Sequence, residues 1–198
     1  MNRHAFLRLL GAAATTPLRQ TTAASYPSSR LMQPEQLFFQ DDGKIPNSRF
    51  PVLVYRNAFP ARGAAGAAWL EQRFAEQNWT NSWRNGVYAY HHYHSTSHEV
   101  LGVYAGSARL QLGGEQGRPV EVQAGDILVL PAGVGHKNLG SKQLGIVGAY
   151  PDGRHWDVNR GLPGERPQTD QNIAALPIPL TDPLLGSAQG LPTLWKGK

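Results

Sequence analysis

The sequence contains no cysteine, which excludes disulfide bonds, thiolate metal ligands and cysteine nucleophiles together. It also lacks an apolar run long enough to cross a bilayer, so we expect no stable membrane anchor. Charged residues make up only 17% of the chain and hydrophobic residues 40%, a balance typical of a soluble globular protein. The 22 glycines and 15 prolines favour many short strands and tight turns over a helical bundle.

Most of the chain has no excess of basic charge, although the net charge of the whole sequence is +5. Residues 1–32 hold four arginines and no acidic residue, so the remaining residues carry a net charge of only +1. No basic block is available to neutralise a row of phosphates, which excludes nucleic acid as the expected partner. A small-molecule ligand is the expectation instead.

Residues 1–32 have the composition of a leader rather than of a folded domain. Arg3 precedes a short apolar run, and Ala/Thr/Ser-rich sequence follows it. The run from Asn2 to Arg8 resembles a twin-arginine export signal in which His4 replaces the second arginine. We therefore expect export, with a cytoplasmic protein that carries a disordered extension as the alternative.

The periodicity of the rest predicts three further regions. Residues 33–85 hold short strands and one amphipathic helix at residues 64–79, which we expect to pack on the core region. Residues 86–150 form the core of a barrel or sandwich, and residues 151–198, rich in proline and glycine, form a segment that wraps it. The predicted strands of the core are residues 87–94, 99–105, 107–112, 119–123, 126–130 and 143–150.

Four of the seven histidines lie in the run YHHYHSTSHEVLGVYAG at residues 90–106. In a strand over residues 87–94, His92 and His94 share one face with Tyr88 and Tyr90. Glu99 opens the next strand, so that two imidazoles and one carboxylate can bind a divalent metal from one side. A cation beside Glu99 would also offset the cost of burying its charge.

A second segment ends in a histidine about forty residues later. Residues 125–138 read GDILVLPAGVGHKN: a strand, a glycine-rich turn, and His136 at the start of the following strand. This position can bring a third imidazole to the same place.

Together the two segments resemble the motifs of the cupin superfamily. The first motif, G-x5-H-x-H-x4-E-x6-G, is met by Gly86, His92, His94, Glu99 and Gly106. The second, G-x5-P-x-G-x2-H, is met by Gly125, Pro131, Gly133 and His136, although Asn138 follows at two residues where the family usually has asparagine at four. Runs such as LFFQDDGKIPN and WDVNRGLPGERP extend the resemblance, over about residues 33–195, to the YjlB-type subgroup of small bacterial cupins.

The resemblance implies an all-β fold, the cupin jelly roll or double-stranded β-helix barrel, with one N-terminal-side helix and an irregular C-terminal tail. It implies one divalent transition metal, Fe, Mn, Ni, Zn or Cu. The implied ligands are His92, His94, Glu99 and His136.

Three further residues are candidates for the pocket or its surroundings. Tyr88 and Tyr90 either line the pocket or fill the barrel. His98 alternates to the outer face, so we expect it at the rim or behind the ligands rather than on the metal.

Three imidazoles and a carboxylate leave about two of six octahedral positions for substrate, dioxygen or water. One candidate function is therefore a mononuclear metal-dependent oxygenase that acts on a small molecule. A metal-dependent isomerase is the second, but it needs a general base that the sequence does not clearly supply. A non-catalytic small-molecule or metal-binding cupin is the third, and no catalytic residue is assigned.

A homodimer is compatible with the resemblance, because cupin barrels commonly pair through strand edges. We expect the row of Val100, Gly102 and Tyr104 on the outer face to be exposed and available to such a partner.

Overall fold

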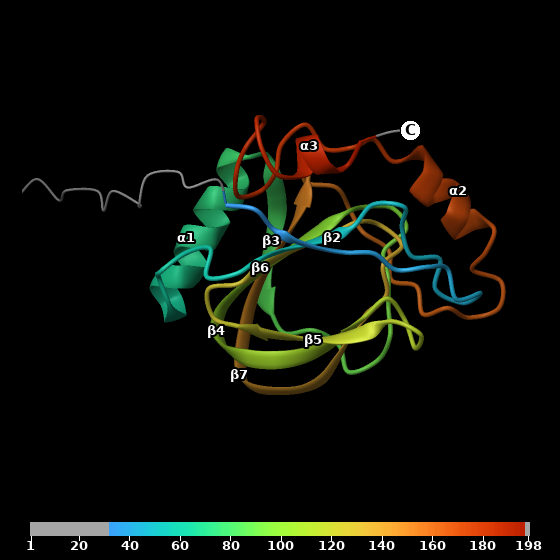
Figure 1. The fold of residues 1–198 in the computed structure, drawn as a ribbon, viewed down its shortest axis with the longest axis horizontal. Helices are drawn as coiled ribbons and strands as arrows, with labels where there is room; N and C mark the ends of the chain where they lie inside the picture. Colours follow the sequence, from blue (N-terminus) through green and yellow to red (C-terminus); the bar gives the residue numbers. More distant parts are fainter. Residues whose placement is uncertain (1–31, 197–198) are drawn as a thin grey trace, which may run out of the picture. The chain divides into compact units, whose positions relative to one another are not determined.

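The computed structural model describes residues 32–196, so the leader expected at residues 1–32 lies outside the described residues except for Met32. Antiparallel strands dominate it and curve around a common interior (Figure 1). The strands occur in the order β1-β2-β6-β4-β7-β3 across the sheet, and β5 also pairs with β4. This architecture confirms the predicted all-β class. The strands are β1 Glu35–Leu37, β2 Val52–Tyr55, β3 Trp79–Asn85, β4 Glu99–Leu112, β5 Arg118–Gln123, β6 Ile127–Leu130 and β7 His136–Pro151.

Alternating side chains divide the core of the barrel into two apolar clusters. Leu101 and Leu128 belong to the cluster inside the barrel, together with side chains of β2, β5 and β7. Their chain neighbours Val100 and Val129 point the other way and join a second cluster, which includes residues of a helix. Both clusters follow from the period of two along a strand. Both faces of β2, of β6 and of the first residues of β4 are therefore buried.

Gly106 explains how β4 continues where two strands were expected. The register of β4 against β7 shifts on both sides of this residue, which has a φ of 64°. A Cβ atom here would collide with the backbone carbonyl oxygens of Lys142 and Gln143. Glycine therefore permits an irregular turn of the backbone without ending the strand, and the predicted strands 99–105 and 107–112 are one element.

The predicted strand at residues 87–94 is wrong as a regular element. β3 covers residues 79–85. After it the chain contacts β7 through isolated backbone bonds, a single bond from Asn138 N to Tyr88 O and the two-bond bridge between His92 and His136. Tyrosine and histidine side chains alternate here as they would in a strand. Such periodicity indicates side-chain direction but not hydrogen bonding, so the sequence could not distinguish a regular strand from an extended loop.

Helix α1 (Gly63–Glu76) packs its buried face against the outside of the barrel. It ends before the predicted residue 79 because Asn78 has a left-handed backbone (φ 60°) and Trp79 begins β3. Leu70 lies so close to Gly102 that any side chain there would meet it. The row of Val100, Gly102 and Tyr104 was predicted to be exposed. Val100 and Gly102 are instead buried under α1, and Tyr104 is half-buried against the same cluster.

The segment after β7 passes around the barrel and contains two short helices, α2 (Gln168–Ala175) and α3 (Leu191–Leu194) (Figure 1). Trp195 anchors its end: the side chain is buried, its Nε1 donates to the Pro51 carbonyl at 2.9 Å, and its ring stacks on Phe50.

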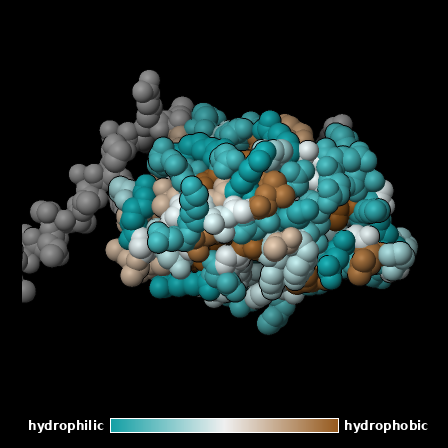
Figure 2. All heavy atoms as spheres, turned by 90° about the horizontal axis from the view of Figure 1, so that it is seen from below, coloured by the Kyte–Doolittle hydropathy of each residue, from teal (hydrophilic) through white to brown (hydrophobic). Residues whose placement is uncertain are grey.

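The outer surface is mainly polar on the face drawn in Figure 2, where hydrophobic side chains form separate patches among hydrophilic ones. None of the helices in residues 32–196 has the length and apolar character needed to span a membrane.

Removing the contact between α1 and the barrel should destabilise the fold. Leu70→Ala is expected to lower the free energy of unfolding by about 2–5 kcal/mol, because it leaves a cavity against Gly102. Urea unfolding of this variant is compared with that of Gln72→Ala, an exposed position on the same helix, which should change stability by less than about 0.5 kcal/mol. Equal effects of the two substitutions would show that this helix face contributes little.

Candidate metal centre

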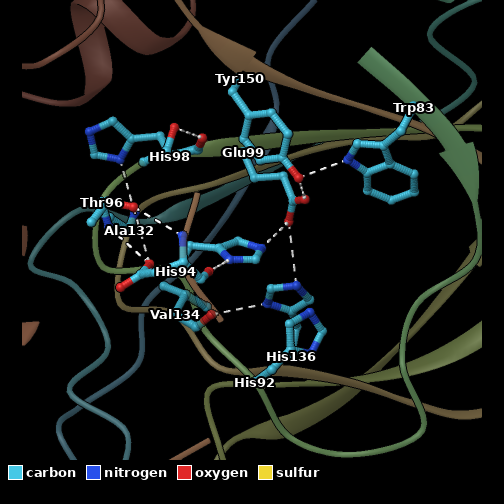
Figure 3. A network of polar contacts seen from close by, with 12 residues as sticks. Trp83, His92, His94, Thr96, His98, Glu99, Ala132, Val134, His136 and Tyr150 are labelled. Carbon is cyan, nitrogen blue, oxygen red and sulfur yellow. Dashed lines mark hydrogen bonds and ion pairs between the residues drawn. The ribbon is translucent and has the colours of Figure 1, made fainter. Parts of the chain in front are cut away.

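Three histidines from distant parts of the chain meet at one point inside the barrel (Figure 3). His92 and His94 follow β3, and His136 is the first residue of β7. Reciprocal backbone bonds between His92 and His136, at 2.9 and 3.2 Å, hold their two segments side by side. All three imidazoles are buried, and their candidate ligand nitrogens lie within 4.8 Å of one another.

The backbone sets the tautomer of each imidazole. Nδ1 of His92 lies 3.4 Å from the Tyr90 carbonyl oxygen, and Nδ1 of His136 lies 3.1 Å from that of Val134. Nδ1 of His94 contacts the carbonyl oxygen of Asp157. Since a carbonyl oxygen only accepts, each neutral ring carries its proton on Nδ1 and keeps a lone pair on Nε2. The three Nε2 atoms are thereby prepared as ligands.

Glu99, the first residue of β4, supplies the fourth candidate ligand. Its Oε2 lies 3.5 Å from Nε2 of His94 and 3.4 Å from Nε2 of His136. Its Oε1 accepts a hydrogen bond from the Tyr150 hydroxyl at 2.9 Å, and that hydroxyl accepts one from Trp83 Nε1 at 2.7 Å (Figure 3). Tyr150 thus occupies one carboxylate oxygen, while Oε2 has no hydrogen-bond donor among the described residues.

These residues fit a metal ion. With the three rings neutral, the lone pairs of three Nε2 atoms and of Glu99 Oε2 converge without a proton donor between them, an arrangement that a cation stabilises and that is unfavourable without one. Two ligands about 2.0–2.2 Å from one ion lie about 3 to 3.5 Å apart. The 3.4 and 3.5 Å separations match this spacing and exceed that of a charge-assisted hydrogen bond.

Burial and charge act in opposite directions within the cluster. Burial, together with the neighbouring imidazoles, lowers the pKa of His92 to about 2, so this ring stays neutral. Burial alone would raise the pKa of Glu99, but protonated His94 and His136 outweigh it and lower that pKa, and Glu99 in turn raises the pKa of His94 against the effect of burial. In the absence of a metal, a proton on these rings thus takes the place of the cation. Burial raises the pKa of Tyr150, and the charge of Glu99 raises it further. Glu99 therefore stays ionised and Tyr150 stays a donor.

A cavity of about 220 Å³ opens beside the four residues. Four aromatic side chains form much of its wall, and the ring of Trp156 stacks on that of Tyr150 with centroids 4.3 Å apart. Arg84 lines it as well, but its Nε and Nη2 each donate a 2.7 Å hydrogen bond to the carboxylate of Glu71. The complete lining is Trp83, Arg84, Asn85, Gly86, Val87, Tyr88, His92, His94, Glu99, Leu101, His136, Tyr150 and Trp156.

The two tyrosines predicted near the pocket differ in their positions. Tyr88 lines the cavity and is half exposed, with its ring stacked on that of Tyr90 at 4.9 Å. Tyr90 does not line the cavity, and the guanidinium of Arg160 lies 4.5 Å from its ring centroid.

His98 does not reach the cavity. It points to the opposite side of the chain from Glu99, as alternation along the strand requires. Its Nδ1 accepts from the backbone N–H of Ala132 at 2.9 Å, its ring packs on Trp195, and burial lowers its pKa to about 4. His98 therefore contacts the turn that leads to His136 rather than the ligand cluster.

Sequence reasoning missed the aromatic and acidic residues that surround the ligands. Tyr150 and Trp83 hold Glu99, while Trp156 and Asp157 lie in the segment that follows β7. The run WDVNRG at residues 156–161 could have indicated them, since it combines a tryptophan with three polar side chains within a proline- and glycine-rich tail. Its position against His94 could not be read from the sequence because the two are 63 residues apart.

Comparison with known proteins places the chain in a family. The sequence pattern described as Cupin domain matches residues 83–144. The uncharacterized protein YjlB of Bacillus subtilis (strain 168) is 42% identical over 160 residues, which cover 80% of this chain and 94% of that protein. The chain belongs to the cupin family. The predicted membership and the jelly-roll fold are thus confirmed.

Solved structures similar to this cupin include two from bacilli. Acireductone dioxygenase from Bacillus anthracis, with a cadmium ion in its active centre, is 15% identical and covers 50% of this chain and 77% of its own, with a TM-score of 0.37. Oxalate decarboxylase of Bacillus subtilis, described by its Mn(II) centres, is 21% identical and covers 68% of this cupin and 32% of its own chain, with a TM-score of 0.34.

The contact between Tyr150 and Glu99 gives a testable prediction. Tyr150→Phe leaves a buried carboxylate oxygen and the Trp83 N–H without partners, so we expect the metal-free cupin to lose about 1–3 kcal/mol of stability. Thermal and urea unfolding measure this loss. Tyr104→Phe removes a hydroxyl from a half-buried tyrosine outside the cavity and should change stability by less than about 0.5 kcal/mol. A neutral Tyr150→Phe would mean that the hydroxyl does not hold the carboxylate.

Proposed function

We propose that this cupin is a mononuclear metal-dependent oxygenase that acts on a small molecule. One observation carries the proposal: the lone pairs of three Nε2 atoms and Glu99 Oε2 converge next to an open cavity rather than inside a filled core. A metal that only stabilised the fold would need no such access, because structural sites are closed by their protein ligands.

The proposed ligands are Nε2 of His92, His94 and His136 and Oε2 of Glu99. Imidazole and carboxylate ligands suit Fe, Mn, Ni, Zn and Cu, and four of them leave about two of six octahedral positions. When bound, a redox-active metal of this group would supply the electron-transfer chemistry that a reaction between dioxygen and an organic substrate requires.

The side chains of this protein limit what the substrate can be. A cavity of about 220 Å³ is smaller than the pockets that hold drug-sized ligands, which indicates a compact substrate. The rings of Trp83, Tyr88 and Trp156 offer flat apolar faces to it. The guanidinium of Arg84 is already paired with Glu71 and is not available as a free charge for a polyanionic substrate. A small planar molecule with oxygen donors fits these walls.

Oxidation fits the residues better than isomerisation does. An isomerase needs a general base within reach of the substrate. The Tyr150 hydroxyl donates to Glu99 and accepts from Trp83, and its raised pKa makes it a poor base. The Nδ1 atoms of the three histidines contact backbone carbonyl oxygens, and their Nε2 atoms are the proposed ligands. The remaining ionisable residues of the cavity wall are Arg84 and the half-exposed Tyr88.

Loss of one imidazole should release the metal. His92→Ala and His136→Ala, purified without an affinity tag, are each expected to lose most bound metal while the barrel remains folded. Elemental analysis gives the metal content per chain, and circular dichroism confirms the fold. His155→Ala removes an exposed imidazole outside the cavity and should keep full metal content. A folded His136→Ala with unchanged metal content would refute the ligand assignment.

The reaction class is tested by oxygen consumption. Wild-type protein loaded separately with Fe(II), Mn(II) and Zn(II) is incubated with a panel of small enols, phenols and chelating acids. The proposal expects oxygen uptake with a redox-active metal, none with Zn(II), and none with Fe(II)-treated His136→Ala. Binding of a panel member without oxygen uptake would instead assign a non-catalytic binding role, and product rearrangement without oxygen uptake would assign an isomerase.

A further inference from the structure

Residues 155–159, here called the 155–159 segment, lie against the loop between His94 and Glu99. This segment follows β7 and lies beyond residues 83–144, the part that matches the cupin pattern. It nevertheless provides the backbone acceptor for one of the three imidazoles, because the carbonyl oxygen of Asp157 contacts Nδ1 of His94. The orientation of that ring therefore depends on where the segment lies.

The side chain of Asp157 fixes the segment to the loop. Its Oδ1 accepts from the backbone N–H of Ser95 at 2.6 Å and of Thr96 at 3.2 Å. Both hydroxyls of these residues also donate to the carboxylate. One aspartate thus contacts three consecutive residues, His94 through its carbonyl oxygen and the next two through its carboxylate.

Further bonds hold Asp157 itself in place. Nδ2 of Asn159 donates to its Oδ2 at 2.8 Å, and Asn159 and Tyr93 exchange two backbone bonds of 2.9 Å. His94 thus has a residue paired with the segment on each side of it, Tyr93 with Asn159 and Ser95 with Asp157.

The same segment builds part of the cavity wall. Trp156, the residue before Asp157, lines the cavity and stacks on Tyr150, whose hydroxyl bonds Glu99. Any movement of the segment would therefore change both the ring of His94 and the wall of the cavity.

We propose that Asp157 is a positioning residue for the metal centre: it fixes the tautomer and orientation of His94 and places Trp156 at the cavity. The inference rests on the proposed function in one respect, that His94 binds the metal. Loss of a residue that orients a metal-bound histidine typically lowers metal affinity about 10- to 100-fold.

The test compares three variants. Asp157→Ala removes all the carboxylate bonds and should weaken Co²⁺ binding about 10- to 100-fold and alter the visible spectrum of bound Co²⁺. Asp157→Asn keeps an oxygen for the Ser95 and Thr96 N–H groups and should restore part of the affinity. Asp152→Asn is the control, since Asp152 bonds Asn78 outside the cavity, and it should bind Co²⁺ like wild type.

A second readout needs no metal. In the metal-free protein, the Nδ1–H proton of His94 should give a slowly exchanging NMR signal that Asp157→Ala loses. The Nδ1–H signal of His136, which faces the Val134 carbonyl, should persist in the same sample as an internal control.

The outcomes separate the two proposals. If wild type binds Co²⁺ and Asp157→Ala binds it with an affinity within twofold of wild type and an unchanged His94 signal, the positioning role alone is overturned. Equal losses of affinity in Asp157→Ala and Asp152→Asn overturn it as well. If wild-type protein does not bind Co²⁺, the proposed function fails and the inference fails with it. Should Asp157→Ala not fold, Asp157→Asn decides by the same criteria.

Discussion

The structure depends on one electrostatic constraint: when the three imidazoles are neutral, four buried acceptor atoms face one another with no proton donor among them. Each imidazole directs its Nδ1 towards a backbone carbonyl oxygen, and the Tyr150 hydroxyl occupies Glu99 Oε1. What remains is a set of lone pairs around one point, held by the backbone and not by the side chains alone. Such an arrangement is unfavourable by itself and favourable around a cation. The surrounding protein therefore selects for a cation by fixing the ligand atoms in place.

Long strands make this convergence possible. β4 and β7 pair from Val100 opposite Ala149 to Leu112 opposite His136, so Glu99 and His136 lie at opposite ends of this pairing. Their side chains meet because the strands curve around a common interior. Gly106 lets β4 continue through an irregular turn, and α1 packs on the outer face. The barrel thus provides rigid positions for Glu99 and His136, while His92 and His94 come from a loop that other segments must hold.

The 155–159 segment is the least expected part of the site. It carries no proposed ligand, yet it contacts His94, walls the cavity with Trp156, and bonds the loop through Asp157. Most of the cavity lining lies within residues 83–144, the part that matches the cupin pattern, and Tyr150 and Trp156 from beyond it complete the wall. Changes in these two positions would alter the cavity without altering the barrel.

The sequence by itself determined the family, the all-β fold and the four residues that converge. It could do so because each of the two motifs is a spacing between residues that are close together along the chain. It could not determine that residues 87–94 form no regular strand or that α1 covers Val100, since side-chain alternation indicates direction but neither strand pairing nor burial by another element. Only the tertiary structure placed Tyr150 on Glu99 and Asp157 on His94, because contacts across 51 and 63 residues arise from the closed barrel and leave no periodic signal in the sequence.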